Sequence, residues 1–161
     1  METFVMTKRL SHLLMIVACS LTAETLSAHG ANEKNPFIVH RQGIYTVANG
    51  HMLALKSIIM LEHPSTKDIS YHAKAILDAF KHHGDAFPKG SDHGSTHAKS
   101  DVWTQHKDFD KKQRAADQAI EQLILFAEQN DKHKTKQAFA DVSKTCKNCH
   151  DDYRKKGNWP F

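Results

Sequence analysis

Apolar residues recur with helical spacing along most of the chain. Between Pro36 and Glu62 they fall at sevens and at threes and fours, which predicts one buried stripe of a long helix. The members of this stripe are Ile38, Tyr45, Ala48, Met52, Leu55 and Ile59. Pro36 is a favourable first residue for a helix, and Pro64 would stop it.

A second helix is predicted after Pro64, with Ser65 or Thr66 as its cap. Its apolar stripe comprises Ile69, Ala73, Ile76, Phe80 and Phe87. Gly84 and Pro88 end the pattern. Residues 88 to 101 are rich in Gly, Ser and other polar groups, so we interpret them as a crossover loop.

Two further helices are predicted beyond this loop. The third, from about Asp101 to Asn130, buries Phe109, Ala116, Ile120, Leu123 and Phe126. The fourth, from about Thr135 to Lys156, buries Phe139, Val142, Cys146, Cys149 and Tyr153. No segment alternates with the period of a strand. Four amphipathic helices with two short links and one longer crossover predict an all-α fold, an antiparallel four-helix bundle.

Composition agrees with one helical domain and excludes some functions. The 161 residues include 7 Gly and 4 Pro, so few residues break helices, and this length suits a single domain with a full core. The net charge of +4 is modest, and acidic residues are interleaved with basic ones. Because no Lys and Arg stripe with exposed aromatic residues is present, binding to nucleic acid is not supported.

The first 28 residues have the character of a cleaved signal peptide. Lys8 and Arg9 precede an apolar run that is too short to span a bilayer, and small residues follow it. We expect cleavage after Ala28, with cleavage after Ala23 as an alternative. The residues before Cys19 also resemble a lipoprotein signal, in which Cys19 would be lipidated and anchor the protein to a membrane. Either signal exports the domain formed by residues 29 to 161, which predicts a periplasmic protein.

The two cysteines of the exported domain form a haem-attachment motif. Cys146-Lys147-Asn148-Cys149-His150 has the Cys-x-x-Cys-His spacing. On a helix the two thiols lie nearly one turn apart, so both can add to the vinyl groups of one haem, and His150 can reach the iron as an axial ligand. A zinc site would need more thiolates, and a thioredoxin-type pair would need a βαβ setting. The motif therefore predicts one covalently attached haem c.

The place of the motif restricts the second axial position of the iron. Only eleven residues follow His150, and none of them is Met or His. Any distal ligand must therefore come from upstream. We expect it to come from the N-terminal helix, which would pair with the C-terminal one.

The order of these features resembles the cytochrome c′ family, the class II c-type cytochromes, over about residues 36 to 156. The residues that carry the resemblance are His40-Arg41-Gln42-Gly43, Phe87 before a Gly-rich loop, Val102-Trp103, and the stretch from Phe139 to Lys156. Gly84 departs from the pattern, because the family often has Trp three residues before the matching Phe. We expect this wall of the haem pocket to be more open.

The resemblance implies roles for residues around the haem. Arg41 and Gln42 would meet a haem propionate, since a guanidinium offers a charge-assisted bond to a carboxylate. Phe87 would belong to the haem pocket. Arg154 lies four residues after His150 and would be the basic residue near the proximal imidazole. Its alternative role is that of one of several cations favoured near the C-terminus of a helix.

Tyr45 decides between the functions known in this family. It lies on the haem-facing stripe, where low-spin relatives have a ligating Met and cytochromes c′ have an apolar or aromatic residue that does not ligate. A phenol titrates near pH 10 and is a poor ligand when neutral, so we predict that Tyr45 is a lid over the distal side. A core tyrosine without a distal role is the simpler alternative. His51 and Met52 lie about two turns away, roughly 10 Å, and are expected at the surface and in the core.

The chain contains 13 histidines, and several cluster around the second helix and the crossover: His72, His82, His83, His93, His97 and His106. Their spacing matches no defined metal site. We interpret them as scattered surface residues, with loose binding of a transition metal as the alternative.

These observations predict a mono-haem protein with five-coordinate, high-spin iron that binds NO or CO without catalytic turnover. A pocket with no polar donor besides the Tyr45 hydroxyl favours these gases over O₂. The alternative is electron transfer through a six-coordinate, low-spin haem and a redox partner. An enzyme would need a distal acid–base pair, for which the sequence offers no clear candidate.

The resemblance also implies a homodimer, because family members commonly dimerise through their first two helices. The first helix carries apolar residues off the haem stripe, namely Ile44, Val47, Ile58 and Leu61. One bundle cannot bury both faces of a helix, so we expect a two-fold dimer.

Overall fold

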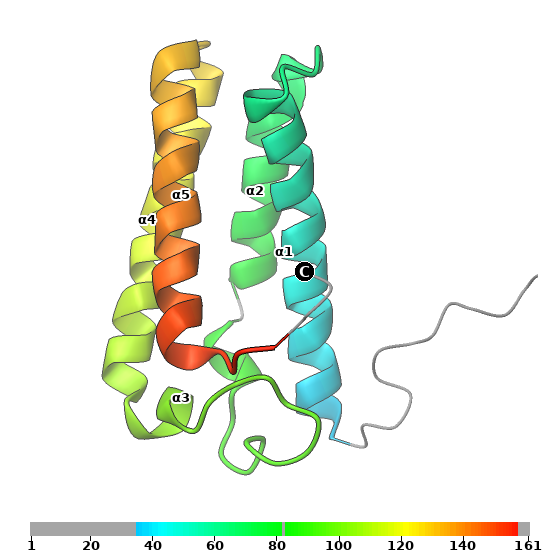
Figure 1. Ribbon diagram of the computed structural model, residues 1–161, viewed down its shortest axis with the longest axis vertical. Coiled ribbons are helices and arrows are strands. Elements are labelled where there is room, and N and C mark those ends of the chain that lie inside the picture. Colours follow the sequence, from blue (N-terminus) through cyan, green and yellow to red (C-terminus); the bar gives the residue numbers. More distant parts are fainter. Residues whose placement is uncertain (1–34, 82, 158–161) are drawn as a thin grey trace, which may run out of the picture. The chain divides into compact units, whose positions relative to one another are not determined.

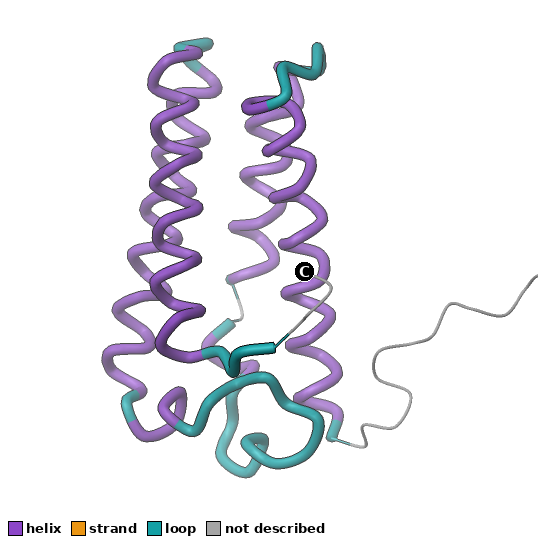
Figure 2. Tube along the Cα trace, viewed as in Figure 1, coloured by secondary structure: helices purple, strands orange, loops and turns teal. Residues whose placement is uncertain are grey.

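The computed structural model describes residues 35–81 and 83–157, in which helices predominate (Figure 1). The predicted signal segment and Cys19 lie outside these residues. In chain order the elements are α1 (Pro36–Met60), η1 (Thr66–Asp68), α2 (Ile69–Phe80), η2 (Gly84–Ala86), α3 (Asp101–Thr104), α4 (His106–Glu128) and α5 (Lys132–Tyr153). Within the described ranges no strand is present, and loops join the helices (Figure 2). None of these helices has the length and hydropathy of a membrane span.

The four long helices form the predicted bundle. Helix α4 packs most extensively against α5, α1 packs against α2, and α2 packs against α4, whereas α1 touches α5 over only a few residues. Consecutive long helices run in opposite directions (Figure 1). The prediction of an all-α, antiparallel four-helix bundle is therefore confirmed.

The helix ends correct several predicted boundaries. The Asn35 side chain caps α1, which ends at Met60 because Leu61 leaves the helical conformation. Neither Ser65 nor Thr66 caps the second helix: Ser65 makes no capping bond, and Thr66 begins the 3₁₀ turn η1 before α2. Helix α2 also ends earlier than predicted, at Phe80.

The predicted third helix is two helices. The backbone departs from helical geometry at Gln105 and divides the segment into α3 and α4. The Trp103 side chain donates a hydrogen bond to the Pro88 carbonyl at 3.1 Å, and this bond ties α3 to the crossover loop. Helix α5 begins at Lys132 because Asp131 caps it, accepting a bond from the Lys134 amide at 3.0 Å.

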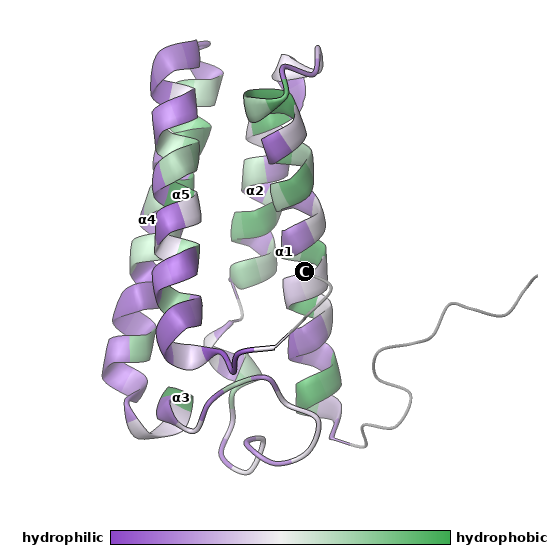
Figure 3. Cartoon of the chain, viewed as in Figure 1, coloured by the Kyte–Doolittle hydropathy of each residue, from purple (hydrophilic) through white to green (hydrophobic). Residues whose placement is uncertain are grey.

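Buried apolar residues form two clusters. The larger one joins all four long helices and consists of Ala48, Leu55, Ile58, Ile69, Ala73, Ile76, Ile120, Leu123, Ala138, Phe139 and Val142. The smaller one lies at the end of the bundle that the crossover covers and consists of Ala86, Phe87, Val102, Phe109 and Tyr153. In Figure 3, α5 turns a largely hydrophilic face to the viewer, whereas α1 carries apolar residues there as well.

Candidate haem site

Cys146 and Cys149 lie in the last two turns of α5 and are free, half-buried thiols. Cys146 packs against the larger apolar cluster, and Cys149 packs against the smaller one, so the pair marks the boundary between the two. Burial raises the pKa of Cys146, and it raises the pKa of Cys149 to about 11 together with the nearby Cys146 thiol. Two neutral thiols one turn apart beside apolar side chains fit attachment to the vinyl groups of a haem.

His150 follows directly on the same helix, and its side chain is exposed to solvent although protein surrounds part of it. Desolvation, followed by the positive charge of Arg154, lowers the pKa of His150, and Asp151 opposes this shift. A lowered pKa keeps the imidazole neutral, which is the form that ligates a metal. The charge of Arg154 thus reaches the imidazole of His150, and its role at a haem stays a prediction.

Tyr45 is half-buried on α1 and packs against the same small cluster as Cys149. Its ring contacts Phe80, with centroids 5.9 Å apart, and His83, with centroids 5.3 Å apart. The Tyr45 hydroxyl shares a hydrogen bond with Nε2 of His83. The side chain predicted to be a lid is thus held by a partner that lies 38 residues away in the sequence.

His83 is buried, with 5% of its surface exposed, so the prediction that it is a surface residue is wrong. Its ring stacks on Phe109 at 5.3 Å, and Nδ1 lies 2.6 Å from Oε1 of Gln113. Burial lowers its pKa, while the bond to Gln113 and the charge of Asp110 oppose the shift.

A signal for the burial of His83 was present in the sequence. Position 83 continues the stripe of α2 at the spacing of threes and fours, between Phe80 and Phe87. His83 is polar, so a stripe defined by apolar residues alone does not include it. The buried position also places a second polar side chain beside Tyr45.

Arg41 is buried on α1, with 3% of its surface exposed, and its guanidinium holds the crossover loop. It donates to the Ser91 carbonyl and to Thr96 Oγ1, each at 2.6 Å, to Ser91 Oγ at 2.9 Å and to the Ala86 carbonyl at 3.4 Å. The neighbouring Gln42 donates to the Ser95 carbonyl at 2.9 Å. The two residues thus share one function in the described structure, and their contact with a haem propionate stays a prediction.

Two aromatic rings complete the setting of Arg41. The guanidinium carbon lies 5.1 Å from the centre of the buried Phe87 ring and 5.6 Å from that of Trp103. Phe87 belongs to the smaller cluster, against which Cys149 packs, and its place in a haem pocket stays a prediction. Gly84 is exposed, and a Cβ added there would meet nothing within 4 Å; its place in the wall of a haem pocket stays a prediction.

The remaining histidines form no metal site in the described ranges, where no three potential ligands come together. His51 is half-buried rather than at the surface, and its Nδ1 lies 2.9 Å from Nδ1 of His72. Met52 packs against the larger cluster, as predicted. His82 lies outside the described residues.

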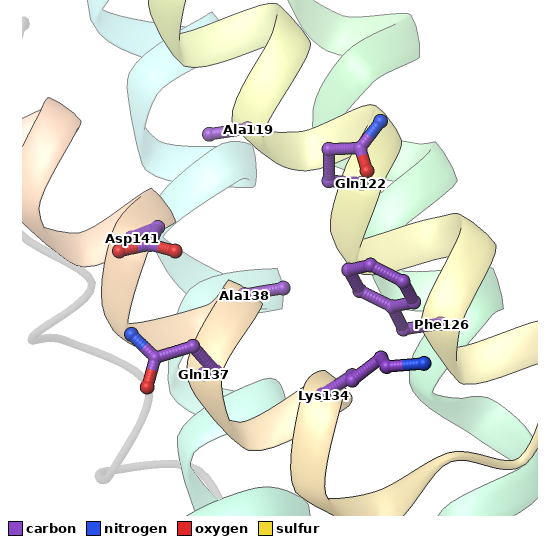
Figure 4. A pocket seen from close by; sticks show the side chains of 7 residues that line it. All are labelled: Ala119, Gln122, Phe126, Lys134, Gln137, Ala138 and Asp141. Carbon is purple, nitrogen blue, oxygen red and sulfur yellow. The ribbon is translucent and has the colours of Figure 1, made fainter.

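A pocket of about 360 Å³ lies between α4 and the N-terminal half of α5 (Figure 4). Its lining residues are Ala119, Gln122, Phe126, Lys134, Gln137, Ala138 and Asp141. Cys146, Cys149 and His150 are absent from this lining and lie near the other end of α5. The pocket therefore takes no part in the candidate haem site.

The fold and the site define a class of protein: a helical bundle with a c-type haem motif near its C-terminus. The chain belongs to the cytochrome c′ family, whose model, described as "Cytochrome C'", matches residues 37–154. Members of this family carry covalently attached haem c, and Cys146 and Cys149 are present here near the C-terminus. The cofactor of this chain is therefore haem c.

Relatives and solved structures agree with this assignment. A cytochrome c′ of Alcaligenes xylosoxydans xylosoxydans is 39% identical over 71 residues, which span 44% of this chain and 54% of that protein. The solved cytochrome c prime from Shewanella frigidimarina is 30% identical with a TM-score of 0.70, covering 78% of this chain and 100% of that one. A nitric oxide complex of a mutant cytochrome c prime from Alcaligenes xylosoxidans is 28% identical with a TM-score of 0.69, covering 75% of this chain and 94% of that one.

Proposed function

We propose that this protein binds NO or CO reversibly at a five-coordinate, high-spin haem. Cys146 and Cys149 form the two thioether bonds, and the neutral imidazole of His150 is the proximal ligand. The haem iron supplies the position at which the gas binds. Tyr45 covers the distal side from α1, and Arg154 tunes the proximal imidazole through its charge.

The observation that carries this proposal is the hydrogen bond between the Tyr45 hydroxyl and His83. The lowered pKa of His83 keeps its imidazole neutral, so the ring can accept the phenol proton in a hydrogen bond without removing it. A phenol that keeps its proton is a poor ligand for iron. The nitric oxide complex solved for the Alcaligenes relative supports the choice of gas.

Electron transfer through a six-coordinate haem is the second candidate, and one observation favours it. Among the histidines of the described residues, only His83 is fully buried. Its Nε2 is hydrogen-bonded to the hydroxyl of Tyr45, the residue proposed to cover the distal side. A histidine that turned toward the iron would be a strong-field ligand. His51 and Met52 are weaker candidates, because they pack against His72 and the larger cluster.

The absorption and electron paramagnetic resonance spectra of purified protein separate the two candidates. High-spin ferric and ferrous spectra, with CO binding to the ferrous form, would support the gas-binding protein. Low-spin spectra in both oxidation states would support electron transfer. Covalent attachment is tested in parallel: the haem should resist acid–organic extraction, and Cys146→Ala combined with Cys149→Ala should release it.

Ligand binding does not require turnover, and we propose that the protein is not an enzyme. His83 bonds to an amide and a phenol, whereas a distal acid would need a proton to offer to the ligand.

We further propose that residues 1–28 direct export to the periplasm. The intact mass of the protein recovered from the periplasm tests this, because cleavage after Ala28 leaves residue 29 as the first residue, and a lipidated Cys19 would give a membrane-bound form instead.

A further inference from the structure

Three side chains from separate parts of the fold form one hydrogen-bonded chain beside the small apolar cluster. Tyr45 comes from α1, His83 from the connection after α2, and Gln113 from α4. The Tyr45 hydroxyl meets Nε2 of His83, and Nδ1 of His83 lies 2.6 Å from Oε1 of Gln113. The residues are separated by 38 and 30 positions in the sequence, so the bundle has to be assembled before the chain exists.

The chemistry of the three groups sets the direction of both hydrogen bonds. An amide oxygen can only accept, so Nδ1 of His83 must carry the proton that it donates to Gln113. A neutral imidazole has one N–H, which leaves Nε2 as an acceptor. The only proton available for the second bond is that of the Tyr45 hydroxyl. Tyr45 therefore donates to His83.

We propose that His83, oriented by Gln113, is the positioning residue that holds the Tyr45 lid closed. The inference rests on the proposed function, because it assumes that a gas binds beneath Tyr45. A ligand that displaces the ring must break the bond to His83 as well as move the phenol. The lid therefore has a latch in addition to its bulk.

The latch also affects which gases bind well. Stable O₂ binding needs a distal hydrogen-bond donor, whereas NO and CO do not. The hydroxyl of Tyr45 is the natural donor on this side, and its proton is engaged by His83. The arrangement thus favours NO and CO over O₂, because it engages the one hydroxyl that could stabilise bound O₂.

His83 is suited to be the fixed partner in this pair. Its ring is stacked on Phe109 and meets Phe87 edge-on, with centroids 5.3 and 5.1 Å apart. Tyr45 is only half-buried and has fewer aromatic neighbours. Movement on ligand entry therefore falls on Tyr45, while His83 keeps its place.

A double-mutant cycle on the haem-loaded protein tests the latch. Tyr45→Phe removes the hydroxyl and keeps the ring, and His83→Leu removes the acceptor. Each change should speed CO association about threefold to tenfold, the factor that corresponds to one net hydrogen bond. The double variant should be no faster than either single one, because both changes break the same bond. Guanidinium unfolding midpoints of the four proteins should show the same non-additivity.

Two further variants sharpen the cycle. Gln113→Leu leaves the tautomer of His83 unfixed, so CO association should be faster than in the wild type but slower than in His83→Leu. His93→Leu removes an exposed histidine of the crossover loop and should leave the CO rate unchanged.

The outcomes distinguish the latch from the proposed function. If Tyr45→Ala speeds CO association while Tyr45→Phe and His83→Leu do not, the lid is purely steric and the latch is overturned, although gas binding stands. If the two single changes speed CO association by factors that multiply in the double variant, the latch is also overturned. A low-spin ferric wild type that becomes high-spin in His83→Leu would overturn both proposals, since the imidazole would then be bound to iron.

Discussion

Tyr45 has two separable properties, a bulky ring and a hydroxyl, and the ring alone carries the steric prediction. Tyr45→Ala should speed CO association and raise CO affinity by at least about tenfold, which corresponds to about 1.4 kcal/mol of steric cost. Resting spectra should stay high-spin. Stopped-flow mixing of the ferrous protein with CO measures the rate. Tyr71→Ala is the matched control, because Tyr71 is an exposed tyrosine on α2 and its loss should change nothing.

Replacing the same residue by methionine should act on ligation instead of access. Tyr45→Met places a thioether where low-spin relatives carry their ligand, so the ferric spectrum should move toward low spin. CO would then have to compete with an internal ligand and should bind more slowly. An unchanged high-spin spectrum of Tyr45→Met would show that α1 holds this position too far from the iron.

His83 makes the stability of the protein sensitive to acid. Burial lowers its pKa in the folded state, so the unfolded chain binds the proton more readily below its ordinary value near 6.5. The free energy of unfolding therefore has its full value above that pH and falls as the pH decreases through it. The charge of Asp110 makes the fall smaller, because it opposes the lowering of the pKa. Between pH 7.5 and 5, the unfolding free energy of wild type should fall more than that of His83→Phe. The exposed His93→Phe should follow the wild type.

At the scale of elements, the buried guanidinium of Arg41 makes several of the hydrogen bonds that hold the crossover loop. Arg41→Gln leaves the polar groups of Ser91 and Thr96 without their buried donor, which should lower the unfolding free energy by about 2–4 kcal/mol. Arg41→Lys should recover only part of this loss, because an ammonium group cannot reproduce the planar fork. Chemical unfolding measures the effect, and limited proteolysis should cut first within residues 88–100.

Gln42→Ala is the neighbouring comparison for Arg41. Its single bond to Ser95 is exposed, so its loss should lower stability by about 1 kcal/mol or less. If Arg41→Gln and Gln42→Ala lower the free energy of unfolding equally, the larger contribution of the buried Arg41 to holding the loop is contradicted.

Periodicity was enough to predict the four long helices, because each must bury one stripe of apolar residues. The helix ends were harder, since they depend on single caps such as Asp131 and on tertiary bonds such as that of Trp103. The haem motif followed from three residues at fixed spacing. The bond between Tyr45 and His83 joins positions 38 residues apart, so no local sequence pattern predicts it.

For the whole molecule, the dimer predicted from the sequence would use exposed apolar residues at the first helix. Val47 on α1 is 53% exposed, and Leu61, the residue that directly follows this helix, is 71% exposed. Two of the other residues predicted for this surface belong elsewhere: Ile58 is buried in the larger cluster, and Ile44 packs against the smaller one. The candidate interface is therefore narrower than predicted from the sequence.

A charge on this face should separate the two subunits. Leu61→Glu combined with Val47→Glu should shift the mass in light scattering from dimer to monomer at micromolar concentration, because two-fold symmetry brings the new charges together. Leu125→Glu is the control, since Leu125 is an exposed leucine on α4. A wild type that is already monomeric would contradict the dimer.

The hydrogen bonds of Arg41 and Lys155 to the crossover loop have a consequence for the order in which the domain folds. Helices α1 and α2, and likewise α4 and α5, are neighbours in sequence and can pair early, since short loops close fast. The bonds of Arg41 to Ser91 and Thr96, and of Lys155 to Thr96, span 50 to 59 residues. Because Thr96 accepts from Arg41 of the first hairpin and from Lys155 after the second, the complete set of bonds forms only once both hairpins have met, which places it in the last step of folding. Weakening them should leave the folding rate nearly unchanged and accelerate unfolding, which makes this loop the element that sets the lifetime of the native state.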